Sequence, residues 1–435
     1  MKTDILIVGS GCAGLYCALH LPKDKSVLII TKSHVESSDS YLAQGGICMM
    51  KNEKDYDSFF QDTMKAGHYE NDQESVEIMI RSSVDVIKDL LSYGVVFNRE
   101  DNGSLAFTRE GAHSDNRILY HQDITGEEIT GQLFEEVSKL PNVKLMEYTS
   151  MIDIISKDNT CYGVVARDKD GNVFMIQADY TVLATGGIGG LYQHSTNFRH
   201  LTGDSVAIAL KHGIELKDVN YVQIHPTTLY SDKEEDRSFL ISESVRGEGA
   251  KLYDKNMNRF VDELLPRDLL TKEILKQMEK DQTKFVWEDL RTIPEEELLS
   301  HFPNIVEHCK KMGYDVTKEC IPVVPAQHYF MGGIKVDHNG KTSMAQLYAI
   351  GETACTGVHG RNRLASNSLL ESLVFAKRAA VEIEEKYIVT MTDGSVYEEY
   401  DLDNYRESDK LAEEYRQLVL NEIARLDKEE KSEET

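Results

Sequence analysis

The sequence predicts an α/β protein whose Rossmann-like nucleotide-binding domain is discontinuous, with an α+β domain inserted in it and a short helical tail after it. Residues 4–8 form an apolar run that ends at Gly9-Ser10-Gly11-Cys12-Ala13-Gly14, as a buried parallel strand ends at a nucleotide-binding loop. A second run of this kind, residues 347–350, ends at Gly351 late in the chain. Strands of one type on both sides of a different middle segment imply that the first domain is interrupted.

Hydrophobic periodicity and turn residues predict the other elements in order. Residues 13–21 are expected to form the helix after the glycines, because Pro22 stops it, and residues 26–31 a second buried strand. The spacing of apolar residues predicts helices over 58–66, 74–93 and 124–140. Short strands are expected over 143–155, 161–168, 173–176 and 180–183, with Asp170-Gly171 as a turn between the second and third of them.

Changes in composition place the domain boundaries. The segment 219–329 has several prolines, mixed short elements and a high charge density, as a separate inserted α+β domain would. The nucleotide-binding domain is therefore expected to consist of residues 1–218 and 330–390. Residues 391–435 are charged and mostly polar, with one amphipathic helix expected over 411–426, and they form the short tail.

The charge balance limits the possible partners. The 435 residues include 48 Lys and Arg against 74 Asp and Glu, for a net charge of −26. This charge argues against nucleic acid and against anionic membrane surfaces as partners. Any site for an anion must therefore be local and built from placed Arg and His side chains and backbone amides. The N-terminal apolar run is too short for a membrane span or a signal peptide.

The seven cysteines are scattered over positions 12, 17, 48, 161, 309, 320 and 355. Their odd number and the absence of a C-x-x-C spacing predict neither a disulfide framework nor a metal site. This usage is typical of a reducing compartment, so we expect a cytoplasmic protein.

The glycine motif predicts dinucleotide binding, because glycines allow the backbone to approach a pyrophosphate at a helix N-terminus. The second strand ends in Thr31-Lys32 rather than in an acid, which disfavours NAD. Four other segments place glycines and polar residues at expected strand or helix ends, and each alone is more often a plain turn. Together they favour a cofactor cavity: residues 40–46, Ala184-Thr185-Gly186-Gly187, Gly203-Asp204 and Gly351-Glu352.

A set of longer motifs resembles the fumarate reductase/succinate dehydrogenase flavoprotein family, from residue 1 to about residue 390. They are Gln44-Gly45-Gly46, Thr108-Arg109-Glu110-Gly111, His225-Pro226-Thr227, Arg246-Gly247-Glu248-Gly249, Pro266-Arg267-Asp268 and Asn362-Arg363-Leu364-Ala365-Ser366-Asn367-Ser368-Leu369. The resemblance implies an FAD-binding domain, a capping domain and a helical C-terminal region. That region usually has three helices, so the tail of this chain is expected to be abbreviated.

The resemblance also implies the FAD contacts. They fall at Gly9, Ser10, Gly11, Cys12, Ala13, Gly14, Lys32, Ser40, Ala43, Gln44, Gly45, Gly46, Ala184, Thr185, Gly186, Asp204, Glu352, Ser368 and Leu369. The last two begin a helix whose positive end would stabilise the anionic reduced flavin. Succinate dehydrogenases attach FAD through a His where this chain has Asp39, so we expect noncovalent FAD.

For the substrate, the resemblance implies two anion pockets for a dicarboxylate. His328 and Arg363 would hold one carboxylate, and His225 with Ser242 the other, with Gln223 nearby. A lone His is more often structural, and it is the motifs that favour the ligand role here. Many relatives have Thr where this chain has Ser242, and the hydroxyl is kept.

Glu110 points to an amino acid substrate. Fumarate reductases have an apolar aromatic residue at this position, whereas an acid would pair with the α-ammonium group of aspartate, which succinate lacks. The alternative for Glu110 is an exposed side chain in a charged loop. Glu243 is a second candidate for the amine. By resemblance Arg267 is the proton-transfer residue, although Arg normally stays protonated and could instead only stabilise charge.

The resemblance therefore implies oxidation of L-aspartate to iminosuccinate, by hydride transfer from Cα to flavin N5. Electrons would pass to oxygen, giving hydrogen peroxide, or to fumarate, giving succinate. This would be the first step from aspartate to NAD, with possible transfer of the imine to a quinolinate synthase. One alternative is a soluble fumarate reductase or succinate-oxidising flavoprotein. Another is a catalytically silent flavoprotein that acts as an interaction or redox-sensing module.

Overall fold

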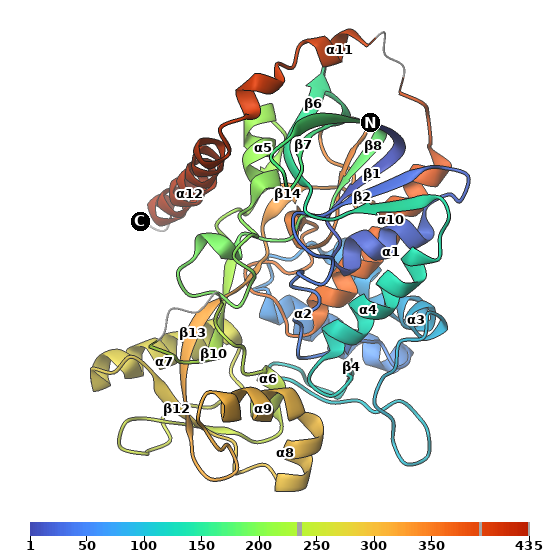
Figure 1. Ribbon diagram of the computed structural model, residues 1–435. Helices are drawn as coiled ribbons and strands as arrows, with labels where there is room; N and C mark the ends of the chain where they lie inside the picture. The colour runs from blue at the N-terminus through green and yellow to red at the C-terminus, as the bar shows by residue number, and fades with distance from the viewer. Residues whose placement is uncertain (233–236, 391–393, 434–435) are drawn as a thin grey trace.

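A computed structural model describes residues 1–232, 237–390 and 394–433. The larger sheet has seven strands in the order β5-β2-β1-β8-β7-β6, with β15 also paired to β8 (Figure 1). Its parallel strands are β1 (Lys2–Val8), β2 (Val27–Ile30), β5 (Val143–Met146), β8 (Val173–Leu183) and β15 (Leu347–Ala349). The antiparallel strands β7 (Thr160–Arg167) and β6 (Ser150–Lys157) extend it at one edge.

Two strand predictions were wrong in detail. The expected strand over 143–155 is two strands, β5 and β6, at opposite ends of the sheet. The expected strands over 173–176 and 180–183 are one long strand, β8. One edge of β8 pairs with β1. The other edge pairs with β7 along the first half of β8 and with β15 at its end. The Asp170-Gly171 turn between β7 and β8 is confirmed.

Alternation along β1 separates two hydrophobic cores, because successive side chains of a strand point to opposite faces. Ile5 and Ile7 pack in the core that contains α1 and α10, whereas Leu6 and Val8 pack in the core that contains α5. Helices of the first core are α1 (Cys12–His20), α2 (Tyr56–Ala66), α3 (Gln73–Ser92), α4 (Thr125–Ser138) and α10 (Asn367–Glu385). The second core is covered by α5 (Asp204–His212).

A four-stranded sheet forms between the two stretches of the larger sheet, in the order β10-β13-β12-β11. Its strands are β10 (Val222–Leu229), β11 (Lys251–Tyr253), β12 (Val286–Asp289) and β13 (Ile321–Phe330). With it lie α6 (Glu243–Gly247), α7 (Arg267–Asp281), α8 (Glu295–His301) and α9 (Pro303–Lys311), and this region has a core of its own (Figure 1). We refer to residues 219–329 as the inserted segment.

Short strands connect these parts. A three-stranded sheet consists of β9 (Leu216–Lys217), β14 (Gly333–Lys335) and β16 (Ala354–Cys355), and β3 (Ile47–Cys48) pairs with β4 (Ile118–Leu119). The three-stranded sheet lies at both ends of the inserted segment, since β9 precedes this segment and β14 follows it. Its position fixes where the chain enters and leaves that segment.

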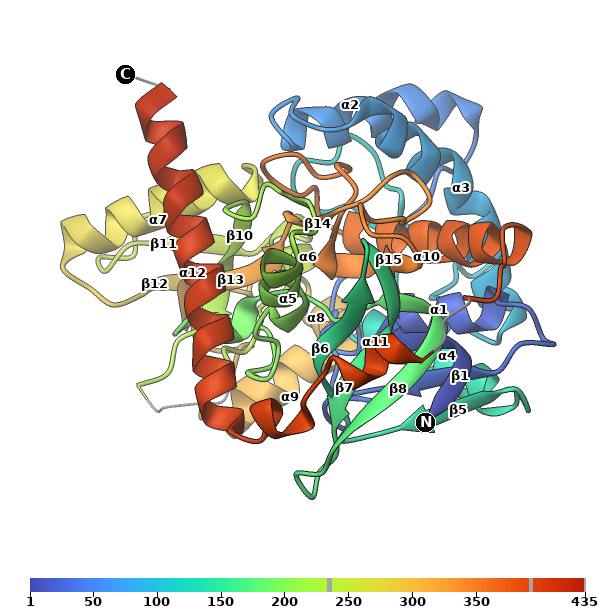
Figure 2. The same cartoon turned by 90° about the horizontal axis from the view of Figure 1, so that it is seen from above.

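The tail consists of α11 (Ser395–Glu398) and α12 (Ser408–Glu433), which lies beside α5 (Figure 2). The predicted helix over 411–426 is thus confirmed but is longer, and residues 391–393 and 434–435 lie outside the described residues. Tyr415 and Val419 of α12 are buried against the second core. The Tyr405 hydroxyl donates to the buried carboxylate of Asp153 on β6 at 2.7 Å. The tail is therefore docked on the sheet.

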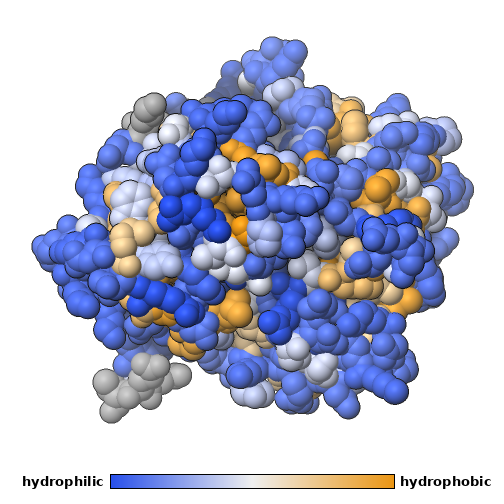
Figure 3. Space-filling model, turned by 90° about the horizontal axis from the view of Figure 1, so that it is seen from below, coloured by the Kyte–Doolittle hydropathy of each residue, from blue (hydrophilic) through white to orange (hydrophobic). Residues whose placement is uncertain are grey.

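The face shown in Figure 3 is mostly hydrophilic, with apolar side chains in small separate patches. Within the described ranges, no helix is both long and apolar enough to cross a membrane.

Candidate active site

One large cavity brings together the glycine loop, residues 37–46, residues 196–204, the start of α10 and the facing parts of the inserted segment. Every residue that the sequence predicted as a site residue lines it, except Cys12, Gly14 and Gln223. Those three lie directly behind it. Cys12 is buried in α1, Gly14 packs against the carbonyl of Gly9, and Gln223 hydrogen-bonds to side chains that do line the cavity.

The glycine loop fits a pyrophosphate. Gly9 ends β1 with a φ of +118°, and a Cβ there would lie 2.0 Å from the carbonyl oxygen of Ala184. Only glycine fits this position. Gly11 is the N-cap residue of α1 and has no side chain that could cap the helix, so the N-terminus of α1 faces the loop. The loop and the helix end together provide the local positive potential that an otherwise acidic protein needs to bind this group.

The start of α10 gives a second positive helix end. Its N-cap residue, Ser366, has a left-handed backbone (φ +60°) and makes no side-chain cap hydrogen bond. Ser368 and Leu369 of the first turn line the cavity. The amides of this turn can therefore stabilise an anion within the cavity, as expected for a reduced flavin.

Two acids line the same cavity, and both are compatible with an anionic cofactor. Burial raises the pKa of Asp39, and burial followed by the charge of Asp39 raises the pKa of Glu352. Asp39 Oδ1 accepts the amide of Phe198 at 3.0 Å, and Glu352 Oε1 accepts the amide of Phe330 at 2.9 Å. Because their pKa values are raised, these two carboxyl groups stay protonated up to a higher pH, and a neutral carboxyl group repels a phosphate less than a carboxylate does. The cavity thus fits FAD.

Lys32 and Asp204 were predicted as separate contacts, and the structure pairs them. Lys32 Nζ lies 2.6 Å from Asp204 Oδ2 and also donates to the carbonyl of His200 at 2.8 Å. The pair joins the end of β2 to the start of α5 at the rim of the cavity. Lys32 therefore neutralises the acid at this end.

Arg267 is clamped from two directions. It begins α7 and is 7% exposed. Its Nε donates to Glu243 Oε2 at 2.5 Å, and its Nη1 donates to Gln223 Oε1 at 2.8 Å. Gln223 in turn donates to the Arg363 carbonyl at 2.8 Å. The guanidinium is thus fixed relative to the loop that carries Arg363.

Both predicted histidines line the cavity with their rings nearly perpendicular, at a centroid distance of 5.1 Å. Burial, then the charge of Arg267, holds the pKa of each His well below its usual value. His328 Nδ1 lies 2.7 Å from the Thr196 hydroxyl. His225 Nδ1 lies 2.9 Å from the Thr227 carbonyl oxygen and 3.2 Å from the Thr227 amide, and the buried Nε2 of His225 has no hydrogen-bond partner among the described residues. Nε2 is therefore available to a ligand.

Arg363 completes this end of the cavity. Its guanidinium stacks 4.5 Å from the centroid of the Tyr329 ring and donates through Nη1 to the Ser368 hydroxyl at 3.1 Å. Burial, then the charge of Arg267, lowers the pKa of Arg363 to about 10. The side chain remains cationic near neutral pH. Two arginines and two neutral imidazoles in one cavity form a site for a compact dianion.

Glu110 is buried in this cation-rich region, and only 3% of its surface is exposed. The exposed-loop alternative is therefore wrong. The Ser366 hydroxyl donates to Glu110 Oε2 at 2.5 Å, and the Ser244 hydroxyl donates to Oε1 at 2.7 Å. Burial, followed by the charge of Glu243, raises the pKa of Glu110.

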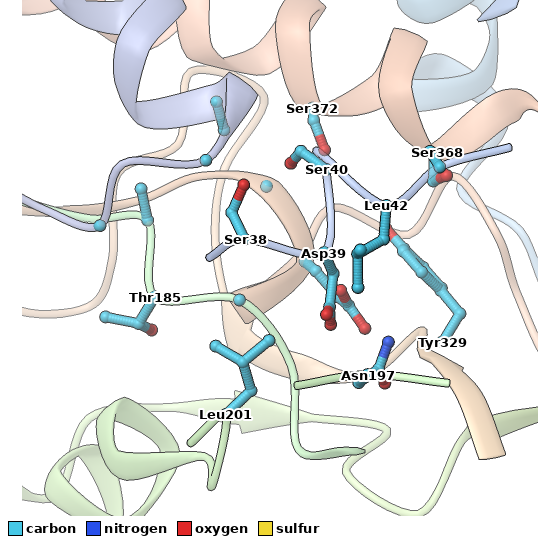
Figure 4. A pocket seen from close by; sticks show the side chains of 18 of the residues that line it. Ser38, Asp39, Ser40, Leu42, Thr185, Asn197, Leu201, Tyr329, Ser368 and Ser372 are labelled. Atoms are coloured by element: carbon cyan, nitrogen blue, oxygen red, sulfur yellow. The ribbon is translucent and has the colours of Figure 1, made fainter. Parts of the chain in front are cut away.

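Several lining residues were missed by the sequence reasoning. Figure 4 shows the missed residues Ser38, Asn197, Leu201, Tyr329 and Ser372 around the same space as Asp39, Leu42 and Thr185. Tyr329 could have been found, since it adjoins His328, and Ser366 lies inside a quoted motif. Asn197 and Leu201 lie in a loop without a recognisable pattern, so no sequence signal indicated them.

Comparison with known proteins gives a consistent family. Residues 4–369 match the family described as FAD binding domain. The chain is 50% identical over 426 residues to an L-aspartate oxidase of Clostridium perfringens, covering 97% of this chain and 94% of the relative. It is 40% identical over 394 residues to a chloroplastic L-aspartate oxidase of Nicotiana tabacum, covering 86% of this chain and 61% of the relative.

The fold has solved relatives as well. A chain of E. coli quinol fumarate reductase superposes with a TM-score of 0.86 at 30% identity, covering 92% of this chain and 73% of that one. A chain of a Mycobacterium smegmatis Sdh1 complex gives a TM-score of 0.77 at 28% identity, with coverage of 92% and 72%. On this evidence, the chain belongs to the L-aspartate oxidase family of FAD-binding flavoproteins.

Proposed function

We propose that this protein catalyses the FAD-dependent oxidation of L-aspartate to iminosuccinate. One observation carries the proposal beyond the family match. A buried acid, Glu110, lies in the same cavity as Arg267, Arg363 and two neutral imidazoles. Such a cavity offers complementary partners to two carboxylates and one ammonium group, which is the charge pattern of L-aspartate.

The two carboxylates are assigned to two neighbouring pairs of residues. Arg363 with His328 holds one of them, and His225 with Ser242 holds the other. Arg363 supplies the charge and a planar fork of donors. His225 Nδ1 faces both the Thr227 carbonyl oxygen at 2.9 Å and the Thr227 amide at 3.2 Å, so the ring can take either tautomer. We assign the tautomer whose Nδ1 accepts the amide, because its Nε2–H donates to the second carboxylate.

The ammonium group is assigned to Glu110 rather than to Glu243. Glu243 is engaged by Arg267 at 2.5 Å and lies within 3.9 Å of Arg246, so its charge is already compensated. Among the described residues, the Glu110 carboxylate accepts hydrogen bonds from two neutral hydroxyl groups and from no cation, although the charge of Arg267 acts on it from nearby. An ammonium ion beside Glu110 would supply the missing positive charge, and a substrate without the amine would leave a buried carboxylate unpaired.

Bound FAD supplies the acceptor for the hydride that leaves the substrate Cα. We assign the orientation of the reacting end to Arg267, because Glu243 and Gln223 fix its guanidinium. The ammonium group must lose one proton as the hydride leaves, and ionised Glu110 is placed to accept it. Arg267, a cation held by Glu243, takes part in this transfer by stabilising the charge that develops. Asp39, where succinate dehydrogenases have a flavin-linking His, supports noncovalent attachment of FAD.

In the proposed activity, the final electron acceptor would be oxygen, giving hydrogen peroxide, or fumarate, giving succinate. The same carboxylate pockets suit fumarate, which supports soluble fumarate reduction as the second candidate activity. In the proposed role, the protein performs the first step from aspartate to NAD in the cytoplasm. The odd number and the scattered spacing of the seven cysteines support a reducing compartment. Transfer of the unstable imine to a quinolinate synthase belongs to the same proposal.

The test is anaerobic absorbance of the purified holoprotein. L-aspartate is expected to bleach the flavin band, and succinate is not. Bleaching by succinate alone would move the protein to the fumarate reductase branch. A colourless protein that FAD does not reconstitute would contradict the flavin proposal itself.

A further inference from the structure

Two serine hydroxyls, from different parts of the fold, hold the two oxygens of the Glu110 carboxylate. Ser366 precedes α10 in the nucleotide-binding domain and donates to Oε2 at 2.5 Å. Ser244 belongs to α6 in the inserted segment and donates to Oε1 at 2.7 Å. The Ser244 hydrogen bond therefore crosses from the inserted segment to the domain that carries Glu110.

The contact between these parts is close because of a glycine. A Cβ on Gly247, at the end of α6, would lie 2.6 Å from the carbonyl oxygen of Arg109. Without that side chain, α6 lies directly against the backbone that positions Glu110. Ser244 can consequently reach the Glu110 carboxylate through its short side chain.

Ser244 also touches the carboxylate pocket. The Ser242 hydroxyl, assigned above to a substrate carboxylate, lies 3.3 Å from the Ser244 hydroxyl and accepts the Ser244 amide at 3.3 Å. A short row of hydroxyls thus leads from the carboxylate pocket to the acid assigned to the amine. All three side chains are buried.

We propose that Ser244 is a positioning residue for amine recognition, which orients Glu110 toward the substrate ammonium group only while the inserted segment lies against the nucleotide-binding domain. The inference rests on the proposed function, in which Glu110 binds the amine. It adds that recognition of the amine and closure of the inserted segment are one event. A substrate that lacks the amine gains nothing from this hydrogen bond.

The charges around Glu110 determine the expected pH dependence. Glu243 on α6 repels its ionised form, Arg267 on α7 attracts it, and Arg363 and Cys48 lie within electrostatic range. Only ionised Glu110 pairs with an ammonium ion. Donation by Ser244 lowers the pKa of Glu110 against the larger effect of burial. Loss of this donor raises that pKa, so the acidic limb of kcat/KM for L-aspartate should move to higher pH.

The experiment compares Ser244→Ala, Ser244→Thr and Glu110→Gln holoproteins, each checked for FAD content. Ser244→Ala is expected to raise KM for L-aspartate on the order of tenfold, because a hydrogen bond to a buried charged group is lost. The inhibition constant of succinate, which lacks the amine, should not rise. Ser244→Thr restores the hydroxyl and should restore KM. The acidic limb should shift upward in Ser244→Ala alone of the two serine variants.

The outcomes separate the two proposals. If Glu110→Gln leaves KM for L-aspartate unchanged, the assignment of the amine to Glu110 fails, and this inference fails with it. If Glu110→Gln raises KM for L-aspartate but Ser244→Ala does not, only the role of Ser244 is overturned. An equal rise in KM for L-aspartate and in the inhibition constant of succinate in Ser244→Ala would also overturn the role of Ser244, because a general loss of packing affects the binding of both ligands.

Discussion

At the scale of single residues, the site depends on side chains that are fixed before any substrate arrives. Arg267 illustrates this, because Glu243 and Gln223 hold its guanidinium in one orientation. An acidic protein gains a site for a dianion in this way, through a few buried cations whose positions are set by neighbours. Preorganised charge of this type stabilises a transition state without reorganisation.

Substitution of Arg267 should affect chemistry more than cofactor binding. Arg267→Leu is expected to slow anaerobic flavin reduction by L-aspartate about 10²–10⁴-fold, the usual effect of losing a group that takes part in proton transfer. FAD content should not change. The control is Arg81→Leu, because Arg81 is a half-exposed side chain on α3 paired with Glu77. A normal rate of flavin reduction in Arg267→Leu would remove Arg267 from the reaction.

Gly9 offers a test of the cofactor end. Gly9→Ala places a Cβ 2.0 Å from a backbone oxygen and forces a non-glycine residue to a φ of +118°. We expect purified Gly9→Ala to lack the flavin absorbance band. Gly171→Ala is a matched control, since it also has a positive φ but its Cβ would meet nothing within 4 Å. It should cost about 1 kcal/mol and keep its FAD. Equal FAD content in both variants would contradict the role of Gly9.

At the scale of elements, the sequence predicted α1 to α4, α12 and the strands of the larger sheet, but not all of their connections and not the individual elements of the inserted segment. Apolar runs and periodicity were sufficient for α1 to α4, because local spacing determines an amphipathic face. The course of β8 was not predictable, since its two halves pair with different partners on one edge. Such pairing is a tertiary property. The inner contacts of Glu110 were missed for the same reason, since Ser244 and Ser366 are distant in sequence.

The docking of the tail can be tested at Asp153. This carboxylate on β6 lies 2.7 Å from His212 Nε2, 2.5 Å from Lys211 Nζ and 2.7 Å from the Tyr405 hydroxyl. Burial raises its pKa, but these three hydrogen bonds together lower it below the ordinary value. The stabilisation is therefore present above the unfolded-state pKa near 3.8, and is lost as the pH falls through the still lower folded value.

Asp153→Asn should lower the free energy of unfolding by about 3 kcal/mol at pH 7, because partners of a buried charge are left unpaired. Thermal unfolding at pH 7 and at pH 3.5 measures the effect, which should be smaller at the lower pH. Asp158→Asn, in the exposed turn before β7, is the control and should change little. A tail that stays protected from proteolysis in Asp153→Asn would contradict this account of docking.

At the scale of the whole molecule, buried acids make stability depend on pH. Burial raises the pKa of Glu288, on β12 of the inserted segment, to about 7. It raises the pKa of Glu371, on α10, to about 8. Glu371 keeps a hydrogen bond from the Thr356 hydroxyl at 2.8 Å. Glu288 is 0% exposed, and neither of its carboxyl oxygens has a hydrogen-bond partner in the described part of the chain. Burial is therefore the largest influence on its pKa, ahead of the charges of Arg246 and Glu263.

The sign of this effect follows from proton linkage. The folded pKa of Glu288, about 7, exceeds its ordinary value of 4.5, so the native protein retains a proton that the unfolded chain releases. The contribution of Glu288 to the free energy of unfolding is fully favourable below pH 4.5 and is lost as the pH rises through 7. Glu288→Gln has no proton to lose. At pH 8.5 this variant should be more stable than the parent protein by up to about 3 kcal/mol, and at pH 5 nearly equal to it.

Thermal unfolding of the two holoproteins between pH 5 and pH 8.5 measures this difference directly. Glu307→Gln provides the control, because Glu307 is an exposed residue of α9 that pairs only with Lys311 one turn away, and its removal should shift neither end of the curve. Glu288 lies on β12 in the inserted segment, so a pH-dependent gain would show that ionisation within this segment limits the stability of the protein at high pH. A difference between Glu288→Gln and the parent that is the same at every pH would show that Glu288 titrates alike in the folded and unfolded chains, and would contradict the buried, protonated state.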